Sequence, residues 1–417
     1  MKIGIVGCVH GCLNELYAAV AETEKHLNEK IDVILCCGDF QAVRNPADLS
    51  TMSCPAKYRH LGAFHEYYYG NKVAPYLTIF VGGNHEASNH CQELPYGGWV
   101  APNIYYMGYV GCIKLGNLTI GGISGIFGPR DYMKGRFEEP PYEPDTLRSV
   151  YHIRKLDINR LCMLPKLNAD KKIDIFLSHD WPTKVVSLAS QGEDVHGLLR
   201  KKPFFMQDIQ TERLGCKPLN EVLSTLRPKY WFAAHLHVKY ATIVRHNSDT
   251  FQKDPDEINL LEDNSDDEET KKRHKTSSSN DTTRFLCLDK IIPGRDFFQV
   301  ISIPEEAKDA KLYYDLDWLA IIKATHVLTP VTVNPNPNLL QFPRANLLEA
   351  KDFIEKKFPR PIEIPYNFQV TALPSDHQLN PSGLNGNPQT DEFFKMLEIP
   401  YFSTSLGVPC ANSNINE

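Results

Sequence analysis

The sequence predicts an α/β protein built from layers of sheet and helix. Apolar runs of about four to eight residues, each followed by glycine or a polar residue, are typical of buried strands. Between the first two runs, residues 14–27 place their apolar side chains at helical spacing, which completes a strand–helix–strand unit. In such sheets the chemistry collects on the loops beyond the strand ends. The predicted strands of the first half lie at residues 2–6, 32–37, 76–83, 118–125, 173–178 and 230–236.

Composition narrows the class of protein. The 417 residues are 42% hydrophobic and 23% charged, as expected for a globular protein with one large catalytic domain and additions. A net charge of −6 restricts any nucleic-acid site to a local basic patch. No apolar run approaches the roughly 20 residues of a membrane span, so no membrane association is expected, and the N-terminus lacks a secretion pattern. The 11 cysteines, an odd number without framework spacing, indicate free thiols in a reducing compartment.

Shifts in composition divide the chain. We expect a catalytic domain over residues 1–246, within which residues 124–161 begin as a loop after a strand. Residues 247–283 are acidic, then basic, then rich in serine and threonine, which predicts a disordered insert. Its basic stretch "KKRHK" fits either a nuclear-import patch or a solvated run. A small C-terminal accessory domain over 284–405 and a frayed tail over 406–417 complete the division.

The accessory region has its own element pattern. Residues 284–304 predict a strand pair with a turn at Pro293-Gly294. Residues 312–325 predict a strand followed by a helix, and helical spacing recurs at 345–358 and 390–397. We expect this region to wrap back onto the catalytic domain.

Metal-binding side chains follow five of the predicted strands. A single histidine or cysteine in an apolar context is more often an ordinary core residue, but donors in this order after five of the predicted strands are not expected by chance. The last stretch, "AHLH", leaves two readings open: an extended backbone would point both imidazoles to one side, and a sharp loop would point them at different ions. The donors are Cys8 and His10, Asp39, Asn84 and His85, His179, and His235 and His237.

The order of these donors resembles the calcineurin-like metallophosphoesterases, whose blocks run DxH, GD, GNH[DE], H and HxH. Within them the chain looks like the lariat debranching enzymes, on the stretches "GCVHGCLNELY", "CGDFQAVRN", "FVGGNHEASNH", "GGISGIFGPRDY", "LSHDWP" and "AAHLHVKY". The cysteine at the first position is specific to that branch. The resemblance implies a layered metallophosphoesterase β-sandwich flanked by helices.

The resemblance also implies roles for individual residues. One metal pocket would use Cys8, His10, Asp39 and His237. A second would use Asn84, His179 and His235 and share Asp39, whose two oxygens suit a bridge between two dications. In the family the histidine that corresponds to His85 faces the substrate and donates a proton.

Two nearby side chains, Glu86 and His90, are candidates to orient His85, or are ordinary surface residues. A thiolate ligand is softer than a carboxylate, so Cys8 should favour Zn²⁺ or Fe²⁺ over Mg²⁺ in its pocket. We therefore expect two divalent metal ions, Fe²⁺ and Zn²⁺, for which Mn²⁺ can substitute.

The implied substrate is branched intron RNA, cleaved at the 2′,5′-phosphodiester of the lariat branch point. Residues 124–161 interleave cations and aromatic rings, a pattern that suits unstacked bases, and correspond to the family's lariat-recognition loop. The alternative is an ordinary surface loop. The candidate substrate contacts are Phe127, Arg130, Tyr132, Arg136, Tyr151 and, from the "HDWP" stretch, Trp181.

Two other functions stay open. One is a metallophosphoesterase acting on another phosphodiester or phosphomonoester, and the other is a non-catalytic scaffold that keeps the fold. The filled donor positions argue against a scaffold. The implied substrate predicts a nuclear location, with shuttling to the cytoplasm and splicing-associated protein partners as further expectations; the oligomeric state is not predicted.

Overall fold

The computed structural model describes residues 1–192, 195–246, 281–304, 311–329, 332–334, 344–375 and 386–401. The expected insert falls outside these ranges except for residues 281–283, and the basic stretch at 271–275 and the expected tail at 406–417 lie wholly outside them.

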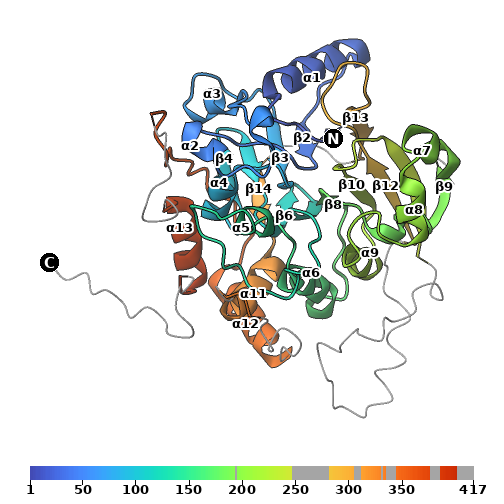
Figure 1. The fold of residues 1–417 in the computed structure, drawn as a ribbon. Coiled ribbons are helices and arrows are strands. Elements are labelled where there is room, and N and C mark those ends of the chain that lie inside the picture. The colour runs from blue at the N-terminus through green and yellow to red at the C-terminus, as the bar shows by residue number, and fades with distance from the viewer. Residues whose placement is uncertain are drawn as a thin grey trace, which may run out of the picture.

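Within these ranges the strands form two sheets (Figure 1). The first has six strands, in the spatial order β13 (Phe298–Ser302), β1 (Lys2–Val6), β2 (Val33–Cys36), β3 (Leu77–Phe80), β5 (Ile104–Tyr106) and β4 (Gly98–Ala101). The second has eight, in the order β14 (Leu312–Tyr314), β6 (Val110–Leu115), β7 (Leu118–Ile123), β8 (Ile175–Ser178), β10 (Tyr230–Ala233), β12 (Thr282–Cys287), β11 (Tyr240–Arg245) and β9 (Ala189–Gly192).

The middle of each sheet is parallel and its edges are antiparallel. Strands β1, β2, β3 and β5 pair in parallel, as do β7, β8, β10 and β12. Strands β13 and β4 flank the first parallel set, and β6 and β11 flank the second, each running antiparallel to its neighbour. Parallel neighbours have their carboxyl ends at the same edge of a sheet, so the loops that follow them gather there.

The two sheets pack face to face over a buried apolar core. Alternate residues of β1 show the pattern: Ile3 and Ile5 lie in the core between the sheets, and Val6 packs on the opposite face beneath α1. From the second sheet, Ile175 and Phe232 enter the same core. The expected β-sandwich is therefore confirmed.

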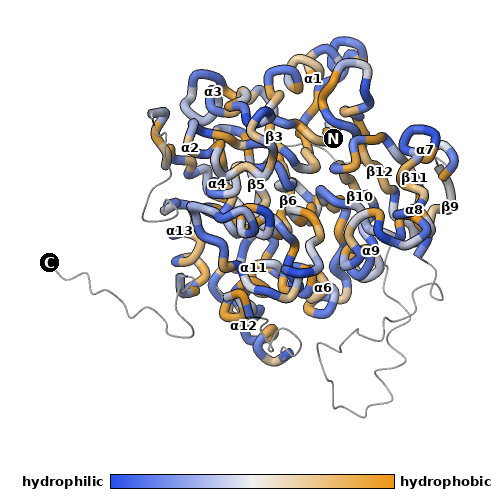
Figure 2. The backbone as a smooth tube through the Cα atoms, in the orientation of Figure 1, coloured by the Kyte–Doolittle hydropathy of each residue, from blue (hydrophilic) through white to orange (hydrophobic). Residues whose placement is uncertain are grey.

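Helices cover both outer faces of the sandwich, in the arrangement visible in Figure 1. Helix α1 (Leu13–Leu27) packs Leu16 and Val20 against the first sheet, and Figure 2 shows both apolar and polar stretches along it. Helices α6 (Lys155–Leu167), α9 (Leu219–Leu226) and α11 (Leu316–Thr325) contribute to the core on the outer face of the second sheet. Among the described residues, the remaining α-helices are α2 (Pro46–Leu49), α3 (Phe64–Tyr68), α4 (Ser88–Glu93), α5 (Thr146–Ser149), α7 (Val195–Lys201), α8 (Phe205–Gln210), α12 (Arg344–Lys357) and α13 (Pro388–Leu397), and short 3₁₀ helices lie at Ala56–Tyr58, Thr183–Val185 and His326–Leu328.

The strands that follow the insert complete both sheets. Residues 284–304 do form two strands, but the expected pairing between them is wrong: β12 lies between β10 and β11 in the second sheet, and β13 pairs with β1 in the first. The stretch at 312–325 forms β14 and α11, and the helices at 345–358 and 390–397 are confirmed as α12 and α13. The division into catalytic and accessory domains stays a prediction, since strands from both regions share the two sheets.

In the portion of the chain that is described, none of the helices has the length and apolar character needed to cross a bilayer.

We predict that Gly7→Ala destabilises the sandwich. An added Cβ at Gly7 would lie 2.0 Å from the carbonyl oxygen of Asp289, whose backbone connects β12 to β13 between the two sheets. Crowding of this kind lowers the free energy of unfolding by about 1–3 kcal/mol or more, measurable by urea denaturation. Gly386→Ala is the matched control, because an added Cβ there meets no atom within 4 Å. Equal stability of the two variants would contradict the prediction.

Candidate metal centre

The candidate metal-binding residues lie on loops at one edge of the sandwich. The loops after β1, β2 and β3 come from the first sheet, and those after β8 and β10 come from the second. The side chains they carry meet between the sheets at the carboxyl ends of the parallel strands. These are Cys8 and His10 after β1, Asp39 after β2, Asn84 and His85 after β3, His179 after β8, and His235 and His237 after β10.

The first expected pocket is present as a compact cluster. The ligand atoms of Cys8, His10, Asp39 and His237 all lie within 4.8 Å of one another. Nε2 of His10 is 3.4 Å from Nε2 of His237 and 3.6 Å from Oδ2 of Asp39. A sulfur, two imidazoles and a carboxylate at this spacing form a donor set for a borderline-soft dication.

The second expected pocket lies on the other side of the same carboxylate. Nε2 of His179 is 3.2 Å from Oδ1 of Asn84 and 3.4 Å from Oδ1 of Asp39. The ring of His235 lies beside it, with the two centroids 4.9 Å apart. Because Oδ2 of Asp39 faces the first group and Oδ1 faces the second, this single carboxylate is placed to bridge two ions.

The structure decides between the two readings of the "HLH" stretch. His235 and His237 both have left-handed backbone, with φ of 64° and 48°, so the chain is sharply bent rather than extended. His235 packs against His179 in the second group, and His237 lies against His10 in the first. The two imidazoles therefore serve two different groups of donors.

Left-handed backbone recurs at this site. Besides the two histidines, His10 and Asp39 have φ of 49° and 46°, a region that costs non-glycine residues energy and persists only where neighbours hold it. Glycines supply the close approach: an added Cβ at Gly38 would lie 2.3 Å from Nδ1 of His179. At Gly83 it would lie 2.2 Å from Oδ1 of Asp39. The glycines of the GD and GNH stretches thus allow the loops to meet.

The protonation states at the site fit metal binding. Burial lowers the pKa of His10, and burial together with the nearby His10 and Lys290 lowers the pKa of His237 to about 4, a direction that favours the neutral imidazoles that bind metal ions. Burial opposes ionisation of Asp39, but His179 and His10 outweigh it and hold its pKa well below the usual value. Burial and the Asp39 charge raise the pKa of the Cys8 thiol well above its usual value. A cation next to Cys8 would favour the thiolate.

Contacts around the donors orient them. Nδ1 of His179 donates to the carbonyl oxygen of Cys37 at 2.8 Å, which fixes the ring with Nε2 turned toward Asn84 and Asp39. The side-chain amide of Gln41 lies 3.1 Å from Nδ1 of His10, and the backbone N–H of His85 donates to Oδ1 of Asp39 at 2.9 Å. The role of Gln41 was not anticipated, although it stands two residues after Asp39.

Glu86 and His90 do not have the partners expected of residues that orient His85. The Glu86 carboxylate accepts backbone N–H groups of Phe40, Gln41 and Gly83 at 2.7–2.9 Å. It therefore fixes the loop that carries Asp39 against the loop that carries Asn84. Nδ1 of His90 donates to the carbonyl oxygen of Ala42 at 2.9 Å.

Comparisons with known proteins agree with this geometry. A family model of the calcineurin-like phosphoesterases matches residues 1–239. A family model of the lariat debranching enzyme C-terminal domain matches residues 280–402. The chain is 42% identical to the lariat debranching enzyme of Gallus gallus over 409 residues, which cover 94% of this chain and 69% of the relative. The lariat debranching enzymes of Drosophila pseudoobscura pseudoobscura and Arabidopsis thaliana are 45% and 40% identical, over 96% and 100% of this chain and 77% and 90% of their own lengths.

The chain belongs to the lariat debranching enzyme family. It is a metal-dependent debranching phosphodiesterase, and hence a hydrolase that acts on ester bonds. The family resemblance inferred from the motifs is confirmed. The assignment of a catalytic or ligand role to each side chain stays a prediction.

In this debranching enzyme, the region expected to recognise the lariat is largely folded onto the second sheet. The Arg136 guanidinium donates to Asp157 at 2.6 Å and lies 3.5 Å from the ring centroid of Tyr109, so its charge is already engaged. Tyr132 packs edge-on against Phe127 at 5.5 Å and joins the core of the second sheet. These contacts give Arg136 and Tyr132 internal roles.

The expectation that Trp181 contacts substrate is wrong. Its side chain has 0% exposure, so no base can stack on it. The indole Nε1 donates to the carbonyl oxygen of Ala234 at 2.9 Å and stands 3.0 Å from Sγ of Cys287. Trp181 instead fixes the loop after β8 against the end of β10.

Among the other expected substrate contacts, Arg130 is exposed, and Phe127, Tyr132, Arg136 and Tyr151 are all half-buried. The Tyr151 hydroxyl lies 3.3 Å from that of Ser53. A residue that the sequence did not single out is Lys290, a half-buried cation whose charge acts on both His10 and His237. The only sequence signal for Lys290 was its position just after β12, at the edge where the other loops meet.

We predict that Gly83→Ala weakens metal binding. Its Cβ would lie 2.2 Å from Oδ1 of Asp39 and 2.8 Å from Nε2 of His179, so the bridging carboxylate must move. Displacing ligands in this way costs about 10–100-fold in metal affinity, which calorimetric titration with Mn²⁺ would measure. Gly82→Ala is the matched control, because its Cβ would meet only ordinary contacts at 3.4 Å or more. Unchanged Mn²⁺ affinity in Gly83→Ala would show that metal binding does not require the Asp39 carboxylate to stay in this position.

Proposed function

We propose that this debranching enzyme hydrolyses the 2′,5′-phosphodiester bond at the branch point of excised intron lariats and so linearises introns for turnover. The observation that carries the proposal is the placement of Asp39 between two groups of donors, one containing Cys8 and the other Asn84. Every relative named above is called a lariat debranching enzyme.

The donor groups would hold two divalent cations. In this proposal the first site consists of Cys8, His10, His237 and one oxygen of Asp39, and the second of Asn84, His179, His235 and the other oxygen. When bound, the pair of cations supplies an activated water and offsets charge on the phosphoryl oxygens. The thiol suits Fe²⁺ or Zn²⁺ in the first site, and Fe²⁺, Mn²⁺ or Zn²⁺ fit the oxygen and nitrogen donors of the second.

His85 is placed to protonate the leaving group. Its ring lies 5.7 Å from that of His10, so it stands beside the donor cluster. Its Nδ1 is buried without a hydrogen-bond partner, which leaves Nε2 as the nitrogen able to reach solvent and substrate. Proton donation from Nε2 to the departing 2′-oxygen would leave a 2′-hydroxyl on the branch nucleotide and a 5′-phosphate on the linear intron.

The substrate groove is proposed to pass the surface residues of the 124–161 region. Arg130 and Arg148 are both exposed, so their charges are available to phosphates. The half-buried ring of Phe127 offers a stacking surface for an unpaired base. Because intron lariats are products of splicing, the enzyme is proposed to act in the nucleus, with shuttling to the cytoplasm and splicing-associated partners as further expectations.

We predict that His85→Ala binds branched RNA normally but cleaves it about 10²–10⁴-fold more slowly, the usual contribution of a positioned general acid. Single-turnover cleavage of a 2′,5′-branched RNA measures the rate, and fluorescence anisotropy measures binding. A chelator should abolish cleavage of the branched RNA by the wild type, and the wild type should not cleave linear 3′,5′-linked RNA.

His26→Ala, in an exposed position on α1, is the control variant. Full activity of His85→Ala would remove this side chain from the reaction, and failure of the wild type to cut branched RNA would contradict the proposed function.

We predict that Cys8→Asp shifts the metal preference from Fe²⁺ and Zn²⁺ toward Mn²⁺, because a carboxylate is a harder ligand than a thiolate. Metal content by mass spectrometry and the activity profile across added metals would report the change. Cys112→Ala removes an equally buried thiol in β6 and should leave the preference unaltered. An unchanged profile in Cys8→Asp would mean that the thiol does not select the metal.

A further inference from the structure

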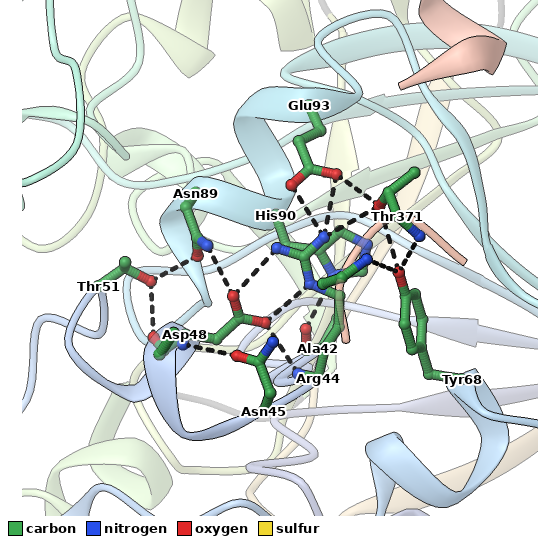
Figure 3. A network of polar contacts seen from close by, with 12 residues as sticks. Ala42, Arg44, Asn45, Asp48, Thr51, Tyr68, Asn89, His90, Glu93 and Thr371 are labelled. Atoms are coloured by element: carbon green, nitrogen blue, oxygen red, sulfur yellow. Dashed lines mark hydrogen bonds and ion pairs between the residues drawn. The ribbon is translucent and has the colours of Figure 1, made fainter. Parts of the chain in front are cut away.

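A buried polar cluster lies just beyond the loop that carries Asp39. Its centre is Arg44, which is 1% exposed. The guanidinium Nε donates to Oδ2 of Asp48 at 2.9 Å and Nη2 donates to Oδ1 at 3.0 Å, while Nη1 donates to Glu93 at 2.8 and 3.0 Å. Figure 3 shows the Arg44 guanidinium between the two carboxylates. A planar fork held on both sides in this way has a fixed orientation.

The cluster joins two loops of the metal centre. Arg44 and Asp48 follow Asp39 in the chain, whereas Glu93 belongs to α4, which begins just after Asn84 and His85. A second bond links the same elements, since the Asn89 amide on α4 donates to Asp48 at 2.6 Å. The far end of the Asp39 loop is therefore attached to the helix that leaves the Asn84 loop.

A segment from the C-terminal region completes the cluster. The Thr371 hydroxyl donates to Glu93 at 3.0 Å and accepts from Nη1 of Arg44 at 3.3 Å (Figure 3). The Tyr68 hydroxyl accepts the backbone N–H groups of Thr371 at 2.6 Å and of the next residue at 3.0 Å. This segment lies within the region that matches the debranching C-terminal domain.

The loop held by this cluster carries strained backbone. Asp39 and Gln41 have φ of 46° and 62°, and such conformations persist only where the surroundings over-determine them. Glu86 holds the start of the loop through the backbone N–H groups of Phe40 and Gln41. Arg44 holds its end. A buried ion pair contributes little net stability, but it can fix one arrangement among several.

We propose that Arg44 is a positioning residue for the debranching reaction: through Asp48 and Glu93 it fixes Asp39 relative to Asn84, and Thr371 completes that arrangement from the C-terminal region. The inference rests on the proposed function in one respect, namely that Asp39 and Asn84 bind the cations.

The test removes one hydroxyl at the distal end of the cluster. Thr371→Val keeps the volume of the side chain but leaves Glu93 and Arg44 without this partner. Calorimetric titration of the RNA-free protein with Mn²⁺ should show affinity about tenfold weaker than that of the wild type. The rate of cleavage of branched RNA should fall at low Mn²⁺ and recover at high Mn²⁺, with KM for RNA unchanged. Thr371→Ser retains the hydroxyl and should restore the wild-type titration.

A second pair of variants separates positioning from general destabilisation. Ile322→Val creates a small packing defect in α11, with 0% exposure at that position, and should lower the unfolding temperature while leaving Mn²⁺ affinity unchanged. Arg44→Lys keeps the charge, loses the fork and should weaken Mn²⁺ binding more than Thr371→Val does. If the wild type bound Mn²⁺ and Thr371→Val, like Ile322→Val, kept the wild-type Mn²⁺ affinity, the role of Arg44 would be overturned while the proposed metal site would stand. If the wild type bound no Mn²⁺, the proposed metal site and the inference would both fail.

Discussion

The buried carboxylate of Asp39 is the constraint on which the rest of the structure depends. An anion with 1% exposure is costly unless hydrogen bonds and opposite charge compensate for lost solvation. Here the compensation comes from a backbone N–H of the Asn84–His85 loop and from imidazoles on either side, one following β1 and one following β8. Because those imidazoles belong to different sheets, the two sheets must pack with the carboxyl ends of their parallel strands at one edge. The packing of the two sheets and the arrangement of the donors around Asp39 therefore depend on each other.

The loops that carry Asp39, Asn84 and His179 lie so close together that glycine is needed at two positions beside the donors. Gly38 and Gly83 stand where a Cβ would collide with His179 or with Asp39 itself. The left-handed backbone at Asp39 brings its carboxylate between the loops, and that conformation needs support on both sides. Glu86 gives that support at the start of the loop and Arg44 at its end. Strain at the site is thus balanced by buried polar contacts on both sides of Asp39.

Much of the fold and most of the donors followed from the sequence, because strand periodicity and the residue after each strand are local properties. The six strands expected in the first half are present, and the donors lie at the carboxyl ends of five of them. The substrate contacts were predicted less well. Trp181 is a residue type that serves equally well in RNA grooves and in cores, so only burial distinguishes the two roles. The 284–304 strands were read as a hairpin because adjacent strands with a turn between them usually pair.

The sequence by itself determined the layered α/β class, the order of the donors, and the thiol that stands where a carboxylate is usual. The tertiary structure alone decided that β12 and β13 join different sheets, and that His235 and His237 serve different donor groups. It alone brought Thr371 to Arg44 across 327 residues. The physical reason is that apolar periodicity tells which face of an element is buried, whereas pairing, register and long-range hydrogen bonds depend on which buried faces finally meet.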